Sequence, residues 1–148
     1  MAHAVFGAKL SRDTDQRQAL LKGLAGALIR SESIETTEAK AKAARDLIEK
    51  LITQAKRANL SDIRQIEAVV ADKDLVDKLV KDIALRFGKR SGGYLRLVKT
   101  GYRVGDNAPM VRMELTAAAT DVIKSTAPAK TAALKKAVTK KTAKKTAK

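Results

Sequence analysis

Residues 86–115 read RFGKRSGGYLRLVKTGYRVGDNAPMVRMEL, and this stretch decides the fold. Apolar residues occupy alternate positions in two runs, 94–100 and 110–116, and alternation at period two is typical of half-buried strands. Gly101, Gly105, Asn107 and Pro109 lie between the runs and mark a turn. The stretch therefore predicts an antiparallel pair of strands whose loop is too long for a two-residue hairpin.

The same stretch carries a large excess of basic side chains. Between residues 86 and 112 the sequence has one acid, Asp106, against seven bases, namely Arg86, Lys89, Arg90, Arg96, Lys99, Arg103 and Arg112. Gly92 and Gly93 have no side chains, so a partner can approach their backbone closely. Because so few acids accompany it, the segment predicts a surface that binds phosphate groups.

Tyr94 and Tyr102, the only two tyrosines, lie inside this basic segment. Aromatic rings in such a position are suited to stacking on bases or riboses. The alternative is a surface hairpin kept soluble by its Arg and Lys residues, with the tyrosines packed on the core.

Helical periodicity precedes the hairpin. Asp13 and Gln16 have the spacing of a capping box, so a first helix is predicted to begin near Asp13. Its apolar face comprises Leu20, Leu21, Leu24, Leu28 and Ile29. Residues 33–36 alternate weakly and predict a short strand that pairs with the later two. Thr36 or Thr37 then caps a second helix. The apolar stripe of this helix comprises Ala44, Leu47, Ile48, Leu51, Ile52 and Ala55.

A third helix is predicted to begin at a Ser61 cap, to break or bend around residues 72–74, and to stop near Gly88. Asp72, Asp74 and Asp77 have no complementary ligand set or glycine-bearing loop, so we interpret them as a helix junction and predict no metal site. Between residues 58 and 85 six acids exceed four bases. This region is expected to face away from a polyanion or toward a basic protein.

The order of elements predicts an α+β domain, with helices packed on one face of a small antiparallel sheet of about three strands. We assign it to residues 11–116, after a short extension at 1–10. Such a sheet is expected to present Arg96, Lys99, Arg103 and the Gly92-Gly93 corner to RNA. Residues 117–148 are almost wholly Ala, Lys and Thr, with nine lysines against one aspartate. They bury too little apolar surface to fold and predict a disordered, phosphate-seeking tail.

Composition narrows the class of protein. The 148 residues carry a net charge of +15, which argues for a polyanionic partner, nucleic acid first and an anionic membrane second. There is no cysteine, hence no disulfide or thiol chemistry. No apolar run approaches the roughly 20 residues needed to span a bilayer, and residues 1–7 lack the features of a secretory signal. We expect a soluble, cytoplasmic protein.

The sequence offers no catalytic constellation. It contains no Ser/His/Asp set, paired catalytic acids, P-loop or metal-ligand spacing. His3, the only histidine, lies in the terminal extension. We therefore predict no enzymatic activity, no cofactor, no metal and no small-molecule substrate.

Two blocks of residues resemble one family. The first block comprises residues 90–94, Arg96, Lys99, Gly101, Arg103 and residues 105–110. The second comprises Leu10, Arg12, Arg17, Ala19, Leu20 and residues 34–37, 39–42, 51–53 and 55–56. In this order, over about residues 8–116, they resemble the seventeenth protein of the bacterial large ribosomal subunit. That family is typically rich in Arg, Lys and His over its first residues, whereas this chain has only His3 and Lys9 there.

The resemblance implies a structural constituent of the large (50S) subunit that binds 23S rRNA, contacts neighbouring ribosomal proteins and supports assembly and translation. Lys40 and Lys42 match the second block and are preferred over the other bases of their helix. The RNA-binding candidates are Lys9, Arg12, Arg17, Lys40, Lys42, Lys89, Arg90, Gly92, Gly93, Tyr94, Arg96, Lys99, Tyr102 and Arg103. The alternative is a free nucleoid- or RNA-associated protein, because the Lys-Ala-Thr tail is similar to the tails of DNA-compacting proteins.

Overall fold

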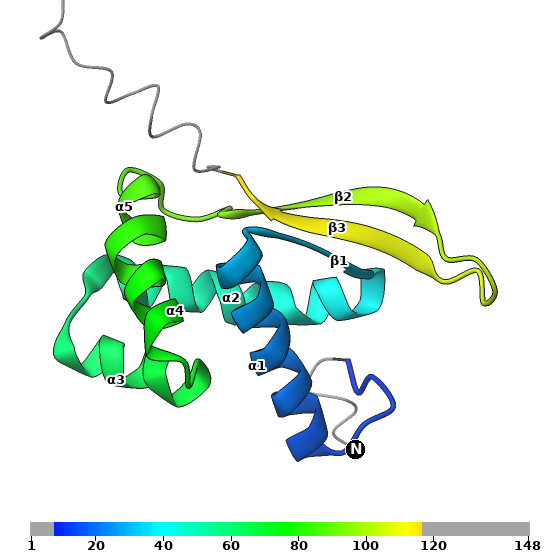
Figure 1. Cartoon of the computed structure of the whole chain (residues 1–148), viewed down its shortest axis with the longest axis horizontal. Helices are drawn as coiled ribbons and strands as arrows, with labels where there is room; N and C mark the ends of the chain where they lie inside the picture. Colours follow the sequence, from blue (N-terminus) through cyan, green and yellow to red (C-terminus); the bar gives the residue numbers. More distant parts are fainter. Residues whose placement is uncertain (1–7, 117–148) are drawn as a thin grey trace, which may run out of the picture. The chain divides into compact units, whose positions relative to one another are not determined.

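The computed structural model describes residues 8–116 of the chain. Residues 1–7 and 117–148 lie outside the described residues, so the domain boundaries and the disordered tail stay predictions. The elements are α1 (Thr14–Ser31), β1 (Ser33–Thr37), α2 (Glu38–Arg57), α3 (Leu60–Val69), α4 (Lys73–Lys78), a π-helical turn η1 (Leu79–Ile83), α5 (Ala84–Arg86), β2 (Leu95–Tyr102) and β3 (Pro109–Leu115). Their order and packing confirm the predicted α+β class (Figure 1).

The three strands form one antiparallel sheet in the order β1-β3-β2. β2 and β3 are joined by residues 103–108, which confirms the long hairpin loop. β1 pairs with β3 alone, so the prediction that it pairs with both later strands is half right. β3 is therefore the central strand. A bulge between Lys99 and Gly101 interrupts the regular pairing of β2.

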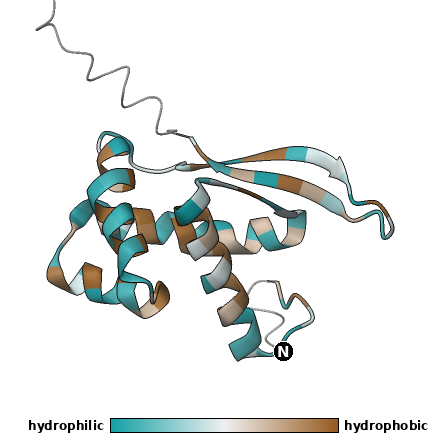
Figure 2. Ribbon diagram, viewed as in Figure 1, coloured by the Kyte–Doolittle hydropathy of each residue, from teal (hydrophilic) through white to brown (hydrophobic). Residues whose placement is uncertain are grey.

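Helices cover one face of the sheet, and the opposite face is open (Figure 1). Val111, Met113 and Leu115 of β3 are buried against the helices, whereas the residues between them are more exposed. Figure 2 shows this alternation of hydrophobic and hydrophilic residues along the hairpin. Burial of every second side chain is the physical reason why the period-two pattern predicts these strands.

α1 and α2 supply much of the core beneath the sheet, and α4, η1 and α5 add to it. On α1, Leu28 and Ile29 are buried, and Leu21 and Leu24 pack at the edge of the core. The stripe predicted on α2 is buried as expected, with Leu47 only partly covered. Asp13 and Thr37 occupy the N-cap positions, but neither side chain makes a capping hydrogen bond. The predicted capping box of Asp13 and Gln16 is therefore not formed.

The predicted third helix is divided. α3 begins at Leu60 with Asn59 as its N-cap, so the prediction of a Ser61 cap is wrong. The predicted break is confirmed, because Asp72 caps a new helix by accepting a hydrogen bond from the Asp74 backbone N–H at 3.1 Å. Helical structure then continues through η1 and α5 to Arg86, two residues before Gly88.

Candidate nucleic-acid interface

Strand alternation separates the basic residues of β2 onto two faces of the sheet. Arg96 is opposite Glu114 on the open face, whereas Lys99 is opposite the buried Val111 and so lies on the helix-covered side. Directly paired residues share a face of a sheet. Lys99 lies near Glu38, the first residue of α2. The pKa of this carboxyl is lowered mainly by the hydrogen bond from Lys42, and the charge of Lys99 adds a smaller effect. The prediction that Arg96 and Lys99 share one RNA-facing surface is wrong.

The open face of the sheet is balanced in charge. Arg96 Nη1 lies 3.6 Å from Glu114 Oε1, and Arg112 is opposite Glu35 of β1. Glu35 also accepts a hydrogen bond from the Thr100 hydroxyl at 2.8 Å. The strand order places the Glu35 carboxylate beside basic side chains of the hairpin that are remote from it in sequence. A count of charges along residues 86–112 therefore does not include Glu35. The open face is thus not the strongly positive surface that the sequence predicts.

The hairpin tip neutralises its own arginine. Arg103 donates to both carboxylate oxygens of Asp106, with Nε–Oδ1 3.0 Å and Nη2–Oδ2 2.6 Å. The hydrogen bond from Arg103 lowers the pKa of Asp106 to about 2, so this carboxylate stays ionised at neutral pH. Beside the pair, Tyr102 is 70% exposed and Val104 is fully exposed. The tip therefore offers an aromatic ring rather than a free cation.

The glycine corner, residues 88–93, lies at the other end of β2. Gly92 and Gly93 are exposed, and a Cβ atom on either would meet no atom within 4 Å. Gly93 has φ +66°, a conformation that glycine adopts readily. Lys89 is exposed, and Arg90 Nη1 donates to the Thr116 hydroxyl at 2.7 Å. Close backbone approach is thus sterically open here, as predicted.

Tyr94 is a core residue. Its side chain is 1% exposed, and its ring packs edge-on against Phe87 with 5.1 Å between centroids. Lys56 Nζ lies 5.4 Å from the ring centroid, 3.3 Å from the phenol oxygen, and also donates to the Arg90 carbonyl. The prediction that Tyr94 stacks on RNA is wrong, and the alternative of core packing is confirmed for this tyrosine.

Arg86 also turns inward. Its side chain is 3% exposed, and it forms ion pairs with Glu32 and Asp82. Hydrogen bonds from Arg86 are the main cause of the lowered pKa of each carboxyl. One of the seven bases counted in the hairpin stretch therefore belongs to the fold and is not available to a phosphate.

The second predicted block gathers basic residues around the amino ends of α1 and α2. Lys9 and Arg12 precede α1, and Arg12 Nη1 donates to the Leu10 carbonyl at 2.8 Å. Arg17 lies in the first turn of α1, and Lys40 in the first turn of α2. Within residues 8–116 none of these four bases has a carboxylate within the 4.0 Å ion-pair distance.

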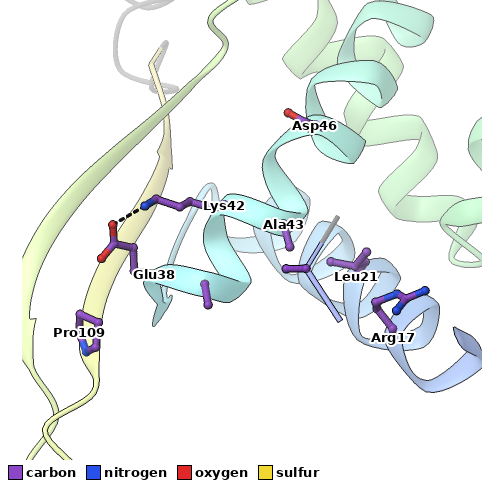
Figure 3. A pocket seen from close by; sticks show the side chains of 9 residues that line it. Arg17, Leu21, Glu38, Lys42, Ala43, Asp46 and Pro109 are labelled. Atoms are coloured by element: carbon purple, nitrogen blue, oxygen red, sulfur yellow. Dashed lines mark ion pairs between the residues drawn. The ribbon is translucent and has the colours of Figure 1, made fainter. Parts of the chain in front are cut away.

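Lys42 differs from these four, because it forms an ion pair of 2.7 Å with Glu38. Both residues line a groove of about 650 Å³ between α1, α2 and the start of β3. Figure 3 shows Arg17 and Leu21 on the α1 side of the groove and Pro109 on the β3 side. We call Lys9, Arg12, Arg17, Lys40, Lys42 and Lys99 the amino-end group.

The predicted site residues thus form two groups, one toward each end of β2, and four belong to neither group, namely Tyr94, Arg96, Tyr102 and Arg103. The glycine corner precedes Leu95, and the amino-end group lies near Lys99 and the far end of the strand. Lys99 lies four residues after Leu95, which at about 3.3 Å per residue corresponds to about 13 Å of strand. This distance, with the charge-balanced open face, divides the single surface that the sequence predicts into two.

Sequence reasoning missed Lys56 as part of the glycine corner. It follows the last buried residue of the α2 stripe, Ala55, but nothing in the local pattern indicates the contact with Arg90 and Tyr94. Within residues 8–116, no group of three or more His, Cys, Asp or Glu residues is placed to hold a metal ion. No helix in this range combines the length and apolar character required to cross a membrane.

Comparisons with known proteins all identify the same family. The family model described as Ribosomal protein L17 matches residues 20–116. A protein of Thermodesulfovibrio yellowstonii is 46% identical over 114 residues, covering 77% of this chain and 86% of the relative. A protein of Natranaerobius thermophilus is 51% identical over 107 residues, covering 72% of this chain and 95% of the relative. A protein of Koribacter versatilis is 49% identical over 115 residues, covering 78% of this chain and 71% of the relative. Each of these three relatives is named large ribosomal subunit protein bL17.

Proposed function

The chain belongs to the ribosomal protein L17 family, and from this premise we propose that it is a structural constituent of the bacterial large ribosomal subunit. In this role it binds large-subunit rRNA, contacts neighbouring ribosomal proteins in the cytoplasmic ribosome, and supports subunit assembly. We assign it no catalytic residue and no cofactor.

The observation that carries the rRNA proposal is the placement of the basic residues. The amino-end group includes five basic residues without carboxylate partners, and the glycine corner adds exposed Lys89 at the start of β2. Phosphate contacts from Lys and Arg release counterions and supply sequence-independent affinity. Two such groups at the ends of a rigid sheet are suited to holding two segments of folded RNA at a fixed separation.

The charge-balanced open face supports the same division of roles. Each of Arg96 and Arg103 already has a carboxylate partner, so neither brings a free charge to RNA. The region from α3 to α4 carries more acids than bases, and a polyanion is repelled from it. We assign rRNA to the glycine corner and the amino-end group, and assign neighbouring proteins to the acidic helices.

Incorporation into subunits tests the proposal. Arg17→Glu with Lys99→Glu removes two bases that have no ion-pair partner, and is expected to abolish co-sedimentation with large subunits in high salt. The matched control is Arg96→Glu with Arg103→Glu, which makes the same change of charge at residues already paired, and is expected to do less. Recovery of the unmodified chain with chromosomal DNA instead of subunits would favour a free nucleoid-associated protein and overturn the proposal.

A further inference from the structure

The groove between α1, α2 and the start of β3 has the dimensions of a ligand site. Its volume of about 650 Å³ falls within the range of about 300–1,000 Å³ that is usual for small-molecule sites. Figure 3 shows Ala43 between the α1 side, with Arg17 and Leu21, and the opposite side, with Lys42 and Pro109.

The lining favours a neutral ring with polar edges. Small or apolar side chains supply much of it, namely Ala8, Leu21, Ala39, Ala43 and Pro109. The charged lining residues are the basic Arg17 and Lys42 and the acidic Glu38 and Asp46. Lys42 is already paired with Glu38 at 2.7 Å. A phosphate group inside the groove would meet the carboxylates of Glu38 and Asp46. A nucleobase would instead bury its faces on the apolar side chains and present N–H donors to Asp46, which has no ion-pair partner among the described residues.

Free cations lie at the margin of the groove. Arg17 lines it without a carboxylate partner, and Lys9 follows Ala8, another lining residue. On the opposite side, Lys99 lies near Glu38. A nucleotide with its base inside the groove would therefore have cations on both sides for its flanking phosphates. The apolar interior and the basic margin together match one unpaired nucleotide, which carries its negative charge outside its base.

We propose that this groove holds a single unpaired base of the bound RNA, with its flanking phosphates on Arg17 and Lys99. The inference rests on the rRNA-binding function proposed above and specifies one contact within it. Sequence-specific RNA recognition uses unstacked bases of loops and bulges, because the edges of paired bases in A-form RNA are inaccessible in its narrow major groove. The groove thus supplies selection of the RNA site, whereas the basic side chains of the amino-end group supply affinity.

Filling the groove without changing its charge is the first test. Ala39→Leu with Ala43→Leu places two larger side chains in the groove, and Leu is a good helix former at both positions. We expect affinity for large-subunit rRNA to fall about tenfold, as for loss of one base contact, with an unchanged salt dependence because no phosphate contact is lost. The control is Ala68→Leu, on the exposed side of α3, which is expected to bind like the unmodified chain.

The salt dependence of RNA affinity distinguishes loss of a base contact from loss of a phosphate contact. Arg17→Gln is expected to reduce the slope of log affinity against log salt by about 1, whereas the groove-filling variant leaves that slope unchanged. Unchanged affinity of a folded groove-filling variant would overturn the proposal. If the unmodified chain itself does not select large-subunit rRNA, the proposed function fails, and that result is distinguishable from failure of the groove alone.

A second measurement does not depend on tolerance of the larger side chains. The chain has no cysteine, so Ala43→Cys introduces a unique thiol of nearly the same size. A photoactivated crosslinker on this thiol, in the full chain assembled into large subunits, is expected to attach to an unpaired rRNA nucleotide. Ala68→Cys with the same reagent is expected not to do so. Attachment of the Ala43→Cys probe only to paired RNA or to a protein would overturn the inference and leave the chain a subunit constituent.

Discussion

Arg86 donates to both carboxylate oxygens of Glu32, with Nη1–Oε2 2.7 Å and Nη2–Oε1 2.9 Å, across 54 positions of the sequence. Glu32 follows α1 in the left-handed conformation at φ +61°, and its carbonyl accepts a hydrogen bond from the Leu115 N–H at 3.1 Å. The same guanidinium also pairs with Asp82. This one side chain therefore connects the end of α1, and through it β3, to η1 and α5.

Removal of the Arg86 guanidinium is expected to destabilise the fold. Arg86→Met leaves the carboxylates of Glu32 and Asp82 without their main partner, and we expect the free energy of unfolding to fall by about 2 kcal/mol at neutral pH. The loss is smaller than for a fully buried pair because both carboxylates keep contact with water. Urea-induced unfolding measures it. Arg45→Met, which removes an exposed pair with Glu49, is the control and is expected to change stability by less than about 0.5 kcal/mol.

The same pairs predict how stability depends on pH. Arg86 lowers the pKa of Glu32 from 4.5 and that of Asp82 from 3.8, so the unfolded chain binds protons at a higher pH than the folded chain does. The stabilisation is therefore fully present above the unfolded values and is lost as the pH falls through the lower, folded values. Thermal unfolding from neutral pH down to about pH 3 is expected to show a smaller decline in Arg86→Met than in the unmodified chain. Parallel declines would contradict this assignment.

The two tyrosines are expected to behave in opposite ways. Tyr94→Ala removes a buried ring and its contact with Phe87, and should destabilise the protein by about 3 kcal/mol or more. Tyr102→Ala removes an exposed ring and should change stability by less than about 0.5 kcal/mol. If Tyr102 stacks on RNA, its variant alone loses rRNA affinity while it remains fully folded. Circular dichroism melting and an rRNA binding assay separate the two effects.

Release of Arg103 from its partner is expected to strengthen RNA binding. Asp106→Asn removes the charge that pairs with Arg103 but keeps an oxygen able to accept from the Ala108 N–H. If the hairpin tip lies against RNA, the freed guanidinium gains a phosphate contact, and the salt dependence becomes steeper by about 1 in log–log slope. Asp77→Asn frees Lys81 in the acidic helical region and is the matched control. An equal gain in both variants would indicate a nonspecific effect of net charge.

The lysine-rich segment after the domain is expected to contribute affinity without selection. Deletion of residues 117–148 removes nine lysines and one aspartate. Binding of the shortened chain should depend less on salt, because fewer counterions are released, while preference for its rRNA site over other RNA stays nearly the same. Filter binding at several salt concentrations with competitor RNA measures both quantities. Loss of preference would place recognition in this segment.

Local chemistry explains the parts of the fold that were predictable. Val111, Met113 and Leu115 alternate because one face of β3 is buried, and the α2 stripe repeats at helical spacing because one side of that helix is buried. The break before α4 was also visible, because Asp72 is a residue type that caps helices. Cap positions were less predictable. Asn59 and Ser61 are both residue types that cap helices, so the local sequence does not choose between them.

The candidate site was predictable in its residue types but not in its arrangement. Arg103 and Asp106 lie close in sequence, yet their pairing depends on the loop conformation. Glu35 reaches Thr100 only because β1 and β2 flank the same central strand, and 65 positions separate the two residues. A charge count along one segment has no information on such partners.

The sequence by itself determined the α+β class, the strands and helices, and the family, because periodic burial and a long signature of residues are properties of the chain read in order. The tertiary structure alone decided which charges are free. Ion pairs act over a few ångströms in space, so Arg86 became a core residue through Glu32, and the open face lost its positive charge through Glu35 and Glu114. Burial of Tyr94 and the groove beside Arg17 likewise arise from segments that meet only in the folded chain.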